Sequence, residues 1–157
     1  MIPEPALRWI FTVAFAAAGA FCLYRGFRAG TAVQRVSGVL HLALCGGMIA
    51  MAWPATMDLA PAPQVLLFGF AAVWFTGLLV SGARGHDGYH AVMAAAMVWM
   101  VLVMSAGASP APAAVLAVVF AAAGTVRLGQ AARVRAAGPA ADAVMGWGMA
   151  LLCALLA

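Results

Sequence analysis

Long apolar runs, broken only by short stretches rich in Pro, Gly and Arg, are the feature that most constrains the fold of this chain. Six of them are long enough, or nearly so, to cross a hydrocarbon layer of about 30 Å as helices that rise about 1.5 Å per residue. They cover residues 5–24, 33–53, 64–81, 89–106, 113–128 and 140–157. Prolines predict a loop over 54–63, and Gly, His and Asp predict a turn over 83–88.

Composition separates this chain from soluble domains. It is 67% hydrophobic and 8% charged, with a mean hydropathy of +1.06, whereas soluble domains use about 45–50% apolar residues. The sequence therefore predicts an all-α integral membrane protein with six transmembrane helices in one domain, residues 1–157. Its expected surroundings are the lipid bilayer, and nucleic acid is not an expected partner although the net charge is +4.

The arginines predict the topology. Seven of the eight lie in or beside the connections that follow the first, third and fifth runs, and only Arg8 belongs to the other side. These seven are Arg25, Arg28, Arg35, Arg84, Arg127, Arg133 and Arg135. Because cytoplasmic loops are enriched in Arg and Lys, we expect those connections to be cytoplasmic and both termini to be external, in a multi-pass protein of the plasma membrane.

Three helical hairpins follow from this topology, and their sequences resemble one another. The repeats cover approximately 5–57, 62–108 and 112–157. The first helix of the first hairpin contains Phe-Ala-Ala-Ala-Gly at 15–19, which recurs at 120–124 and more loosely at 70–74. A period of about 50 residues is typical of repeat proteins. We expect a pseudo-threefold arrangement of parallel repeats about an axis along the membrane normal.

The second helix of each hairpin carries a stripe that the fourth apolar run shows most fully. Its pattern is H-x2-M-x3-M-x2-M, and helical geometry places residues at these spacings on one face. The three copies of the stripe comprise His41, Leu44, Met48 and Met51; His90, Met93, Met97 and Met100; and Asp142, Met145, Met149 and Leu152.

If the three stripes surround one axis, equivalent residues meet in layers. Met48, Met97 and Met149 form a complete methionine layer, and His41, His90 and Asp142 form the layer nearest the cytoplasm. Thioether sulfur is a soft, neutral donor that suits Cu(I), and successive weak sites permit conduction. The pattern predicts Cu(I) as the bound metal ion and copper transport or transfer as the function. Accessory ligand candidates are Cys45, His86 and Met104.

Other interpretations stay open at this point. Methionine also fills gaps in helix packing, so the stripe could be a packing seam. His41 and His90, at equal depth, could ligate haem b. The chain could instead be a non-catalytic membrane subunit or assembly factor of a copper-containing respiratory complex, with a membrane protein partner. Catalytic residues are not expected, because no serine has His and carboxylate partners at useful spacing and no phosphate-binding glycine loop occurs.

The His41 and His90 patterns resemble an uncharacterised family of actinobacterial membrane proteins, defined as a domain of unknown function, over essentially the whole chain. The resemblance implies the topology, and it implies a third His where this chain has Asp142. Separately, the M-x3-M spacing at Met93/Met97 and Met145/Met149 is similar to the pore motif of CTR-type copper transporters. That similarity is an analogy of spacing and threefold geometry.

Overall fold

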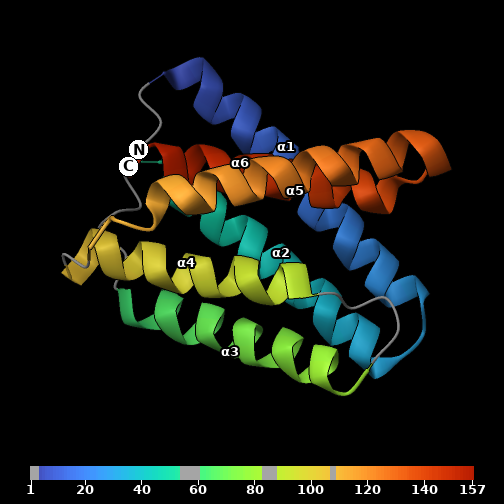
Figure 1. Cartoon of the computed structure of the whole chain (residues 1–157). Helices are drawn as coiled ribbons and strands as arrows, with labels where there is room; N and C mark the ends of the chain where they lie inside the picture. The colour runs from blue at the N-terminus through green and yellow to red at the C-terminus, as the bar shows by residue number, and fades with distance from the viewer. Residues whose placement is uncertain (1–3, 54–60, 83–87, 107–108) are drawn as a thin grey trace. The chain divides into compact units, whose positions relative to one another are not determined.

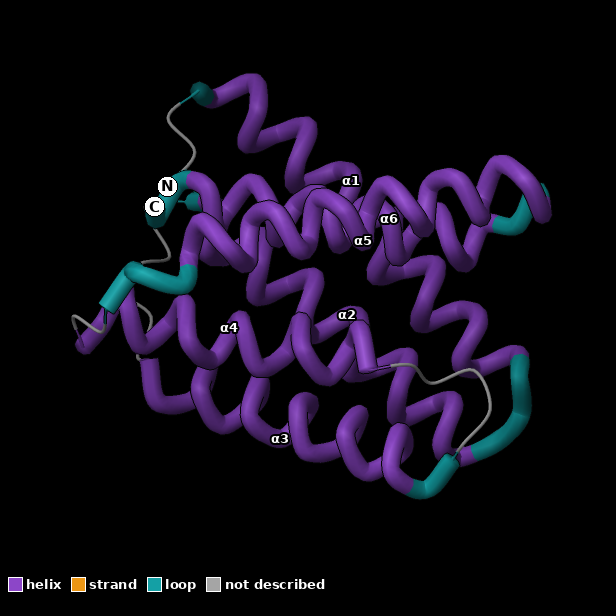
Figure 2. The backbone as a smooth tube through the Cα atoms, viewed as in Figure 1, coloured by secondary structure: helices purple, strands orange, loops and turns teal. Residues whose placement is uncertain are grey.

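A computed structural model describes residues 4–53, 61–82, 88–106 and 109–157. Within these residues the secondary structure is helix and loop, with six α-helices (Figure 2). They are α1 (Pro5–Arg28), α2 (Ala32–Ala52), α3 (Pro61–Val80), α4 (Gly88–Ala106), α5 (Ala113–Val134) and α6 (Ala137–Ala154). All six are long and apolar enough to cross a membrane.

Helices pair along the chain as three antiparallel hairpins, α1 with α2, α3 with α4 and α5 with α6 (Figure 1). The chain divides into two compact units. One unit contains α1, α2, α5 and α6, and within it α6 also packs against α1 and α2. The other, Leu59–Pro110, contains the α3/α4 hairpin. Pseudo-threefold symmetry of the three hairpins, and a single domain, therefore stay predictions.

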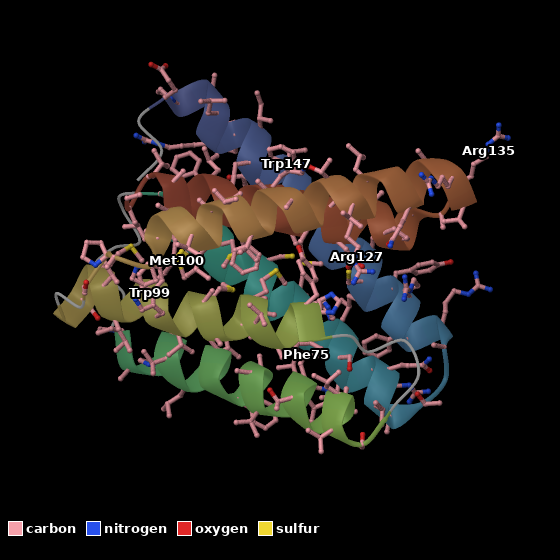
Figure 3. All side chains as sticks on the ribbon, in the orientation of Figure 1. Phe75, Trp99, Met100, Arg127, Arg135 and Trp147 are labelled. Atoms are coloured by element: carbon pink, nitrogen blue, oxygen red, sulfur yellow. The ribbon has the colours of Figure 1, made fainter. Side chains whose placement is uncertain are left out.

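Several helix ends differ from the sequence prediction. Pro61 and Pro63 lie in the first turn of α3, and Pro139 lies in the first turn of α6, where we expected loop residues. The first turn tolerates proline because its backbone N–H groups have no partner within the helix. Helices α1 and α5 extend to Arg28 and Val134, so Arg25 and Arg133 lie in last turns rather than in connections. Figure 3 shows Arg135 at the tip of the α5/α6 hairpin, where its φ is 47°.

Glycines set the close contacts inside the hairpins. A Cβ at Gly19 would lie 3.1 Å from the Cβ of Cys45 in α2, and one at Gly124 would lie 3.2 Å from the backbone N of Trp147 in α6. In lipid, the hydrophobic effect does not drive helices together. Small residues favour helix association instead, because they let the two backbones approach closely. The glycine of the repeated Phe-Ala-Ala-Ala-Gly sequence thus has the same role in both hairpins.

The looser copy of that sequence at Phe70 differs from the other two copies in burial. Phe15 and Phe120 are 1% exposed, but Phe70 is 56% exposed and Phe68 is fully buried. Phe68 also precedes His90 by 22 residues, the distance that separates Phe120 from Asp142. In burial, the residue of α3 that matches Phe15 and Phe120 is therefore Phe68 rather than Phe70.

A polar clasp joins the end of α2 to the start of α1. The indole N–H of Trp53 donates to the Thr12 hydroxyl at 3.0 Å, and that hydroxyl donates to the Arg8 carbonyl at 2.7 Å. The rings of Trp9 and Trp53 meet edge to face with centroids 5.1 Å apart. Tryptophan at a helix end is typical of a membrane–water interface.

Replacing Thr12 by Val should lower the thermal stability of the purified protein in detergent. The substitution keeps the shape but removes the acceptor of the indole N–H, at an expected cost of about 1 kcal/mol. The matched control is Thr125→Val in α5, because the Thr125 hydroxyl bonds the carbonyl of Ala121 in its own helix. An equal loss in both variants would contradict a stabilising role for the clasp.

Candidate metal site

The stripe of α2 is turned away from the surface. Leu44 and Met48 are 1% and 0% exposed, and Met51 is 5% exposed. Cys45, the accessory candidate, is also buried at 1%. His41, one turn earlier, is half-buried. The apolar face of α2 that remains exposed contains Val39 and Leu42 instead.

The stripe of α6 lies in the same compact unit and is buried to the same degree. Met145 and Met149 have no exposed surface, and Leu152 is 5% exposed, while Asp142 is half-buried. Helix α6 packs against both α1 and α2. One contact with α1 is made by the ring of Phe15, which lies over Gly148 and stacks on the Phe11 ring with centroids 4.3 Å apart.

In α4, His90 is 8% exposed, Met93 and Met97 are fully buried, and Met100 is 1% exposed. Met104 is 36% exposed, so it does not share the burial of the stripe that it extends. His86 and Met57 lie outside the described residues. Because α4 belongs to the second unit, the convergence of Met48, Met97 and Met149 on one axis stays a prediction.

The two stripe histidines have different surroundings. The Nδ1–H of His41 donates to the Ser37 carbonyl at 2.7 Å. A histidine held through one ring nitrogen in this way is typical of metal and haem ligands. The ring of His90 lies 5.5 Å from the ring of Phe75, which projects from α3 towards α4 (Figure 3), and 5.2 Å from that of Tyr89. Ligation of haem by both histidines stays a prediction, since they belong to different units.

Asp142 has charged and polar neighbours that the sequence pattern did not indicate. The guanidinium of Arg25 lies against Gly138, one turn before Asp142 in α6. Both Arg25 and Asp142 are near enough to Cys22 of α1 to interact with it electrostatically. Opposite charges near one membrane-embedded helix contact reduce the cost of burying either of them. The spacing of Arg25 from Asp142 in the sequence gave no signal, because only the packing of α1 on α6 brings them close.

Grouped donor side chains of the described residues can be compared with those of known kinds of metal site. Within residues 4–53, 61–82, 88–106 and 109–157, no three His, Cys, Asp or Glu side chains are grouped so that they could hold a metal ion. Zinc, calcium and magnesium sites in proteins are built from those side chains and from oxygen donors. Thioether sulfur recurs in this part of the chain, and as a soft donor it prefers Cu(I).

Six apolar spans in three hairpins define a multi-pass, all-α membrane protein. Within that class, the chain belongs to the DUF5134 family, a domain of unknown function whose match covers residues 33–156. This membership confirms the resemblance to an uncharacterised family. The threefold repeat and the analogy with CTR-type transporters stay predictions.

Similar proteins come from mycobacteria. Uncharacterised proteins of Mycobacterium bovis and of two Mycobacterium tuberculosis strains are each 33% identical to this chain over 113 residues. The matched part is 67% of this chain and 53% of each relative. The chain therefore spans about half the length of the curated relatives that it matches. No solved structure matches it significantly.

Proposed function

We propose that this protein binds Cu(I) on the histidine and methionine stripe and moves copper through or within the plasma membrane. The observation that carries the proposal is the burial of the stripe: Met48, Met51, Met93, Met97, Met100, Met145 and Met149 are all exposed by 5% or less. The large apolar residues exposed on the same helices are Val, Leu and Trp, together with the single methionine Met104. Methionine is thus concentrated where side chains contact protein, at three- and four-residue spacings.

Burial alone would also suit packing, so the chemistry of the neighbouring residues matters. The Nδ1 of His41 is bonded to the Ser37 carbonyl, so Nε2 is the ring nitrogen that we propose as the ligand, and Asp142 has a carboxyl group at the same end of the stripe. Ionisable groups within spans are costly and usually serve a pathway. In the proposed arrangement, the thioethers bind a monovalent ion weakly enough to release it, and imidazole binds it more firmly at the inner end. We propose that this end is cytoplasmic, that both termini are external, and that the protein is not an enzyme.

The test uses the full chain, purified under reducing conditions and loaded with Cu(I) in competition with a chelator. We expect stoichiometric copper, with thioether and imidazole scatterers in the X-ray absorption spectrum. Protein in liposomes should take up Cu(I) with no other subunit. A chain that binds no copper, or one that shows a Soret band after purification with haem, would reject the proposal. Binding without uptake would reject transport and favour the subunit or assembly role.

A further inference from the structure

Close contacts between helices gather exposed arginines at one end of the unit that contains α1, α2, α5 and α6. A Cβ at Gly26 of α1 would lie 3.1 Å from the Gly38 Cα and against the Gln34 carbonyl, so the start of α2 lies beside the end of α1. The guanidinium of Arg25 lies against Gly138 in the first turn of α6, which follows directly on α5. The exposed arginines of these helix ends are Arg25, Arg28, Arg35, Arg133 and Arg135.

The positive charge of this end exceeds the negative charge near it. Within the described part of this unit, the acidic residues are Glu4 and Asp142. Glu4 precedes α1, at the end of that helix opposite to Arg25 and Arg28. Asp142 is half-buried and lies one turn after Gly138 in α6. The exposed arginines therefore outnumber the carboxyl group on their side, and this end attracts anions.

The backbone of Arg135 indicates that its charge has a role. Its φ of 47° and ψ of 41° are those of the left-handed conformation. A side chain is strained there, and glycine is the usual residue at such a helix end. Figure 3 shows Arg135 extending from the tip of the α5/α6 hairpin. Strained backbone of this kind is often found at functional sites, so an arginine in place of glycine favours a ligand for its guanidinium.

Exposed aromatic rings border the arginines of α1. Tyr24 is 58% exposed and Phe27 is 55% exposed. The Arg28 guanidinium donates to the Tyr24 hydroxyl at 2.8 Å, and its Cζ lies 5.7 Å from the centre of that ring. Aromatic rings at the ends of membrane helices lie at the level of the lipid headgroups. Positive charge and apolar rings within one helical turn match a phospholipid better than a soluble anion.

We propose that this end of the unit binds the phosphate of an anionic phospholipid, with Arg25 and Arg28 of α1 and Arg135 as its ligands. Guanidinium groups bind phosphate oxygens through paired hydrogen bonds, and basic sites between membrane helices bind anionic headgroups. The proposal goes beyond the copper function and does not depend on it, because none of these arginines belongs to the stripe. It also holds whichever side of the membrane this end occupies.

The first test uses the wild-type chain, purified in detergent and incubated with phosphatidylglycerol or with phosphatidylcholine. Native mass spectrometry measures the retained lipid, and thermal denaturation measures the stabilisation. We expect preferential retention of phosphatidylglycerol and a higher melting temperature with it. The preference should weaken with salt, because the Debye length falls from about 10 Å at 0.1 M to about 3 Å at 1 M. Equal retention of both lipids, or equal stabilisation by inorganic phosphate, would overturn the proposal.

The second test removes charge from the arginines. Arg25→Gln/Arg135→Gln should weaken phosphatidylglycerol binding about 30-fold, because each arginine near an anionic surface strengthens binding about 5-fold. Arg25→Lys/Arg135→Lys keeps the charge and should retain most of the affinity. The matched control is Arg8→Gln, which removes an arginine near the opposite end of α1 and should leave binding unchanged. Undiminished binding in the double glutamine variant, or a similar loss per charge in Arg8→Gln, would refute this site.

Discussion

Replacing Gly38 by Leu is expected to prevent the α1/α2 hairpin from closing and to abolish monodisperse protein after extraction. A Cβ at this position would lie 3.0 Å from the Cys22 carbonyl oxygen and 3.3 Å from the Gly26 Cα. Both neighbours are backbone atoms, which cannot rotate out of the way. Overpacking a tight contact costs about 1–3 kcal/mol even where side chains can adjust. Size-exclusion chromatography and thermal denaturation in detergent measure the effect.

The matched control is Gly46→Leu on the same helix. A Cβ at Gly46 would meet nothing within 4 Å, and the position is exposed. The two variants make the same change in hydrophobicity and in helix propensity, so their difference isolates the packing of α1 on α2. Gly46→Leu should stay within about 0.5 kcal/mol of the wild type. Similar behaviour of the two variants would contradict the close approach of these helices.

Much of the fold could be predicted because lipid imposes simple demands on length and polarity. Six spans, their order and their pairing as hairpins follow from apolar runs of sufficient length separated by short connections. The burial of the stripe also agrees with its helical period. Within each helix, the methionine at 48, 97 or 149 lies on the same face as its stripe neighbours three and four residues away. None of these three methionines has exposed surface.

The side of a helix that faces protein was harder to predict, as α3 shows. Phe68 and Phe70 are equally hydrophobic, yet one is fully buried and the other is 56% exposed. In a soluble protein the exposed face of a helix is polar, so the sequence indicates which face is buried. In a membrane both faces are apolar, because lipid tails are as apolar as Leu. Sequence similarity therefore aligns Phe70 with Phe15, whereas the residue of α3 that is buried like Phe15 is Phe68.

Polar neighbours across helices were missed for a different reason. Arg25, Cys22 and Asp142 come together only through the packing of α1 on α6, with Gly138 providing the space. No local spacing encodes such a contact between helices that are distant in sequence.

Helix ends were missed because proline is ambiguous: it stops a helix when it lies inside and begins one when it lies in the first turn.

The double substitution Met48→Leu/Met149→Leu is expected to weaken Cu(I) binding to the stripe by about 100-fold, or about 2.7 kcal/mol. Both residues are fully buried in the same compact unit, on helices α2 and α6 that contact each other. Leucine keeps the volume and the hydrophobicity but has no lone pair, so the thermal stability should fall by less than about 1.5 kcal/mol. Chelator competition measures the affinity, and denaturation in detergent measures the stability.

The control for that substitution is Met104→Leu, which removes a thioether from the exposed end of α4. It should leave the Cu(I) affinity unchanged. The comparison distinguishes ligation from packing, because a packing seam requires volume whereas a ligand requires sulfur. If Met48→Leu/Met149→Leu binds copper as tightly as the wild type, the stripe is a packing seam and the copper hypothesis fails for these residues. If the affinity falls while the stability is kept, the recurrence of methionine at these positions has a chemical reason that leucine cannot supply.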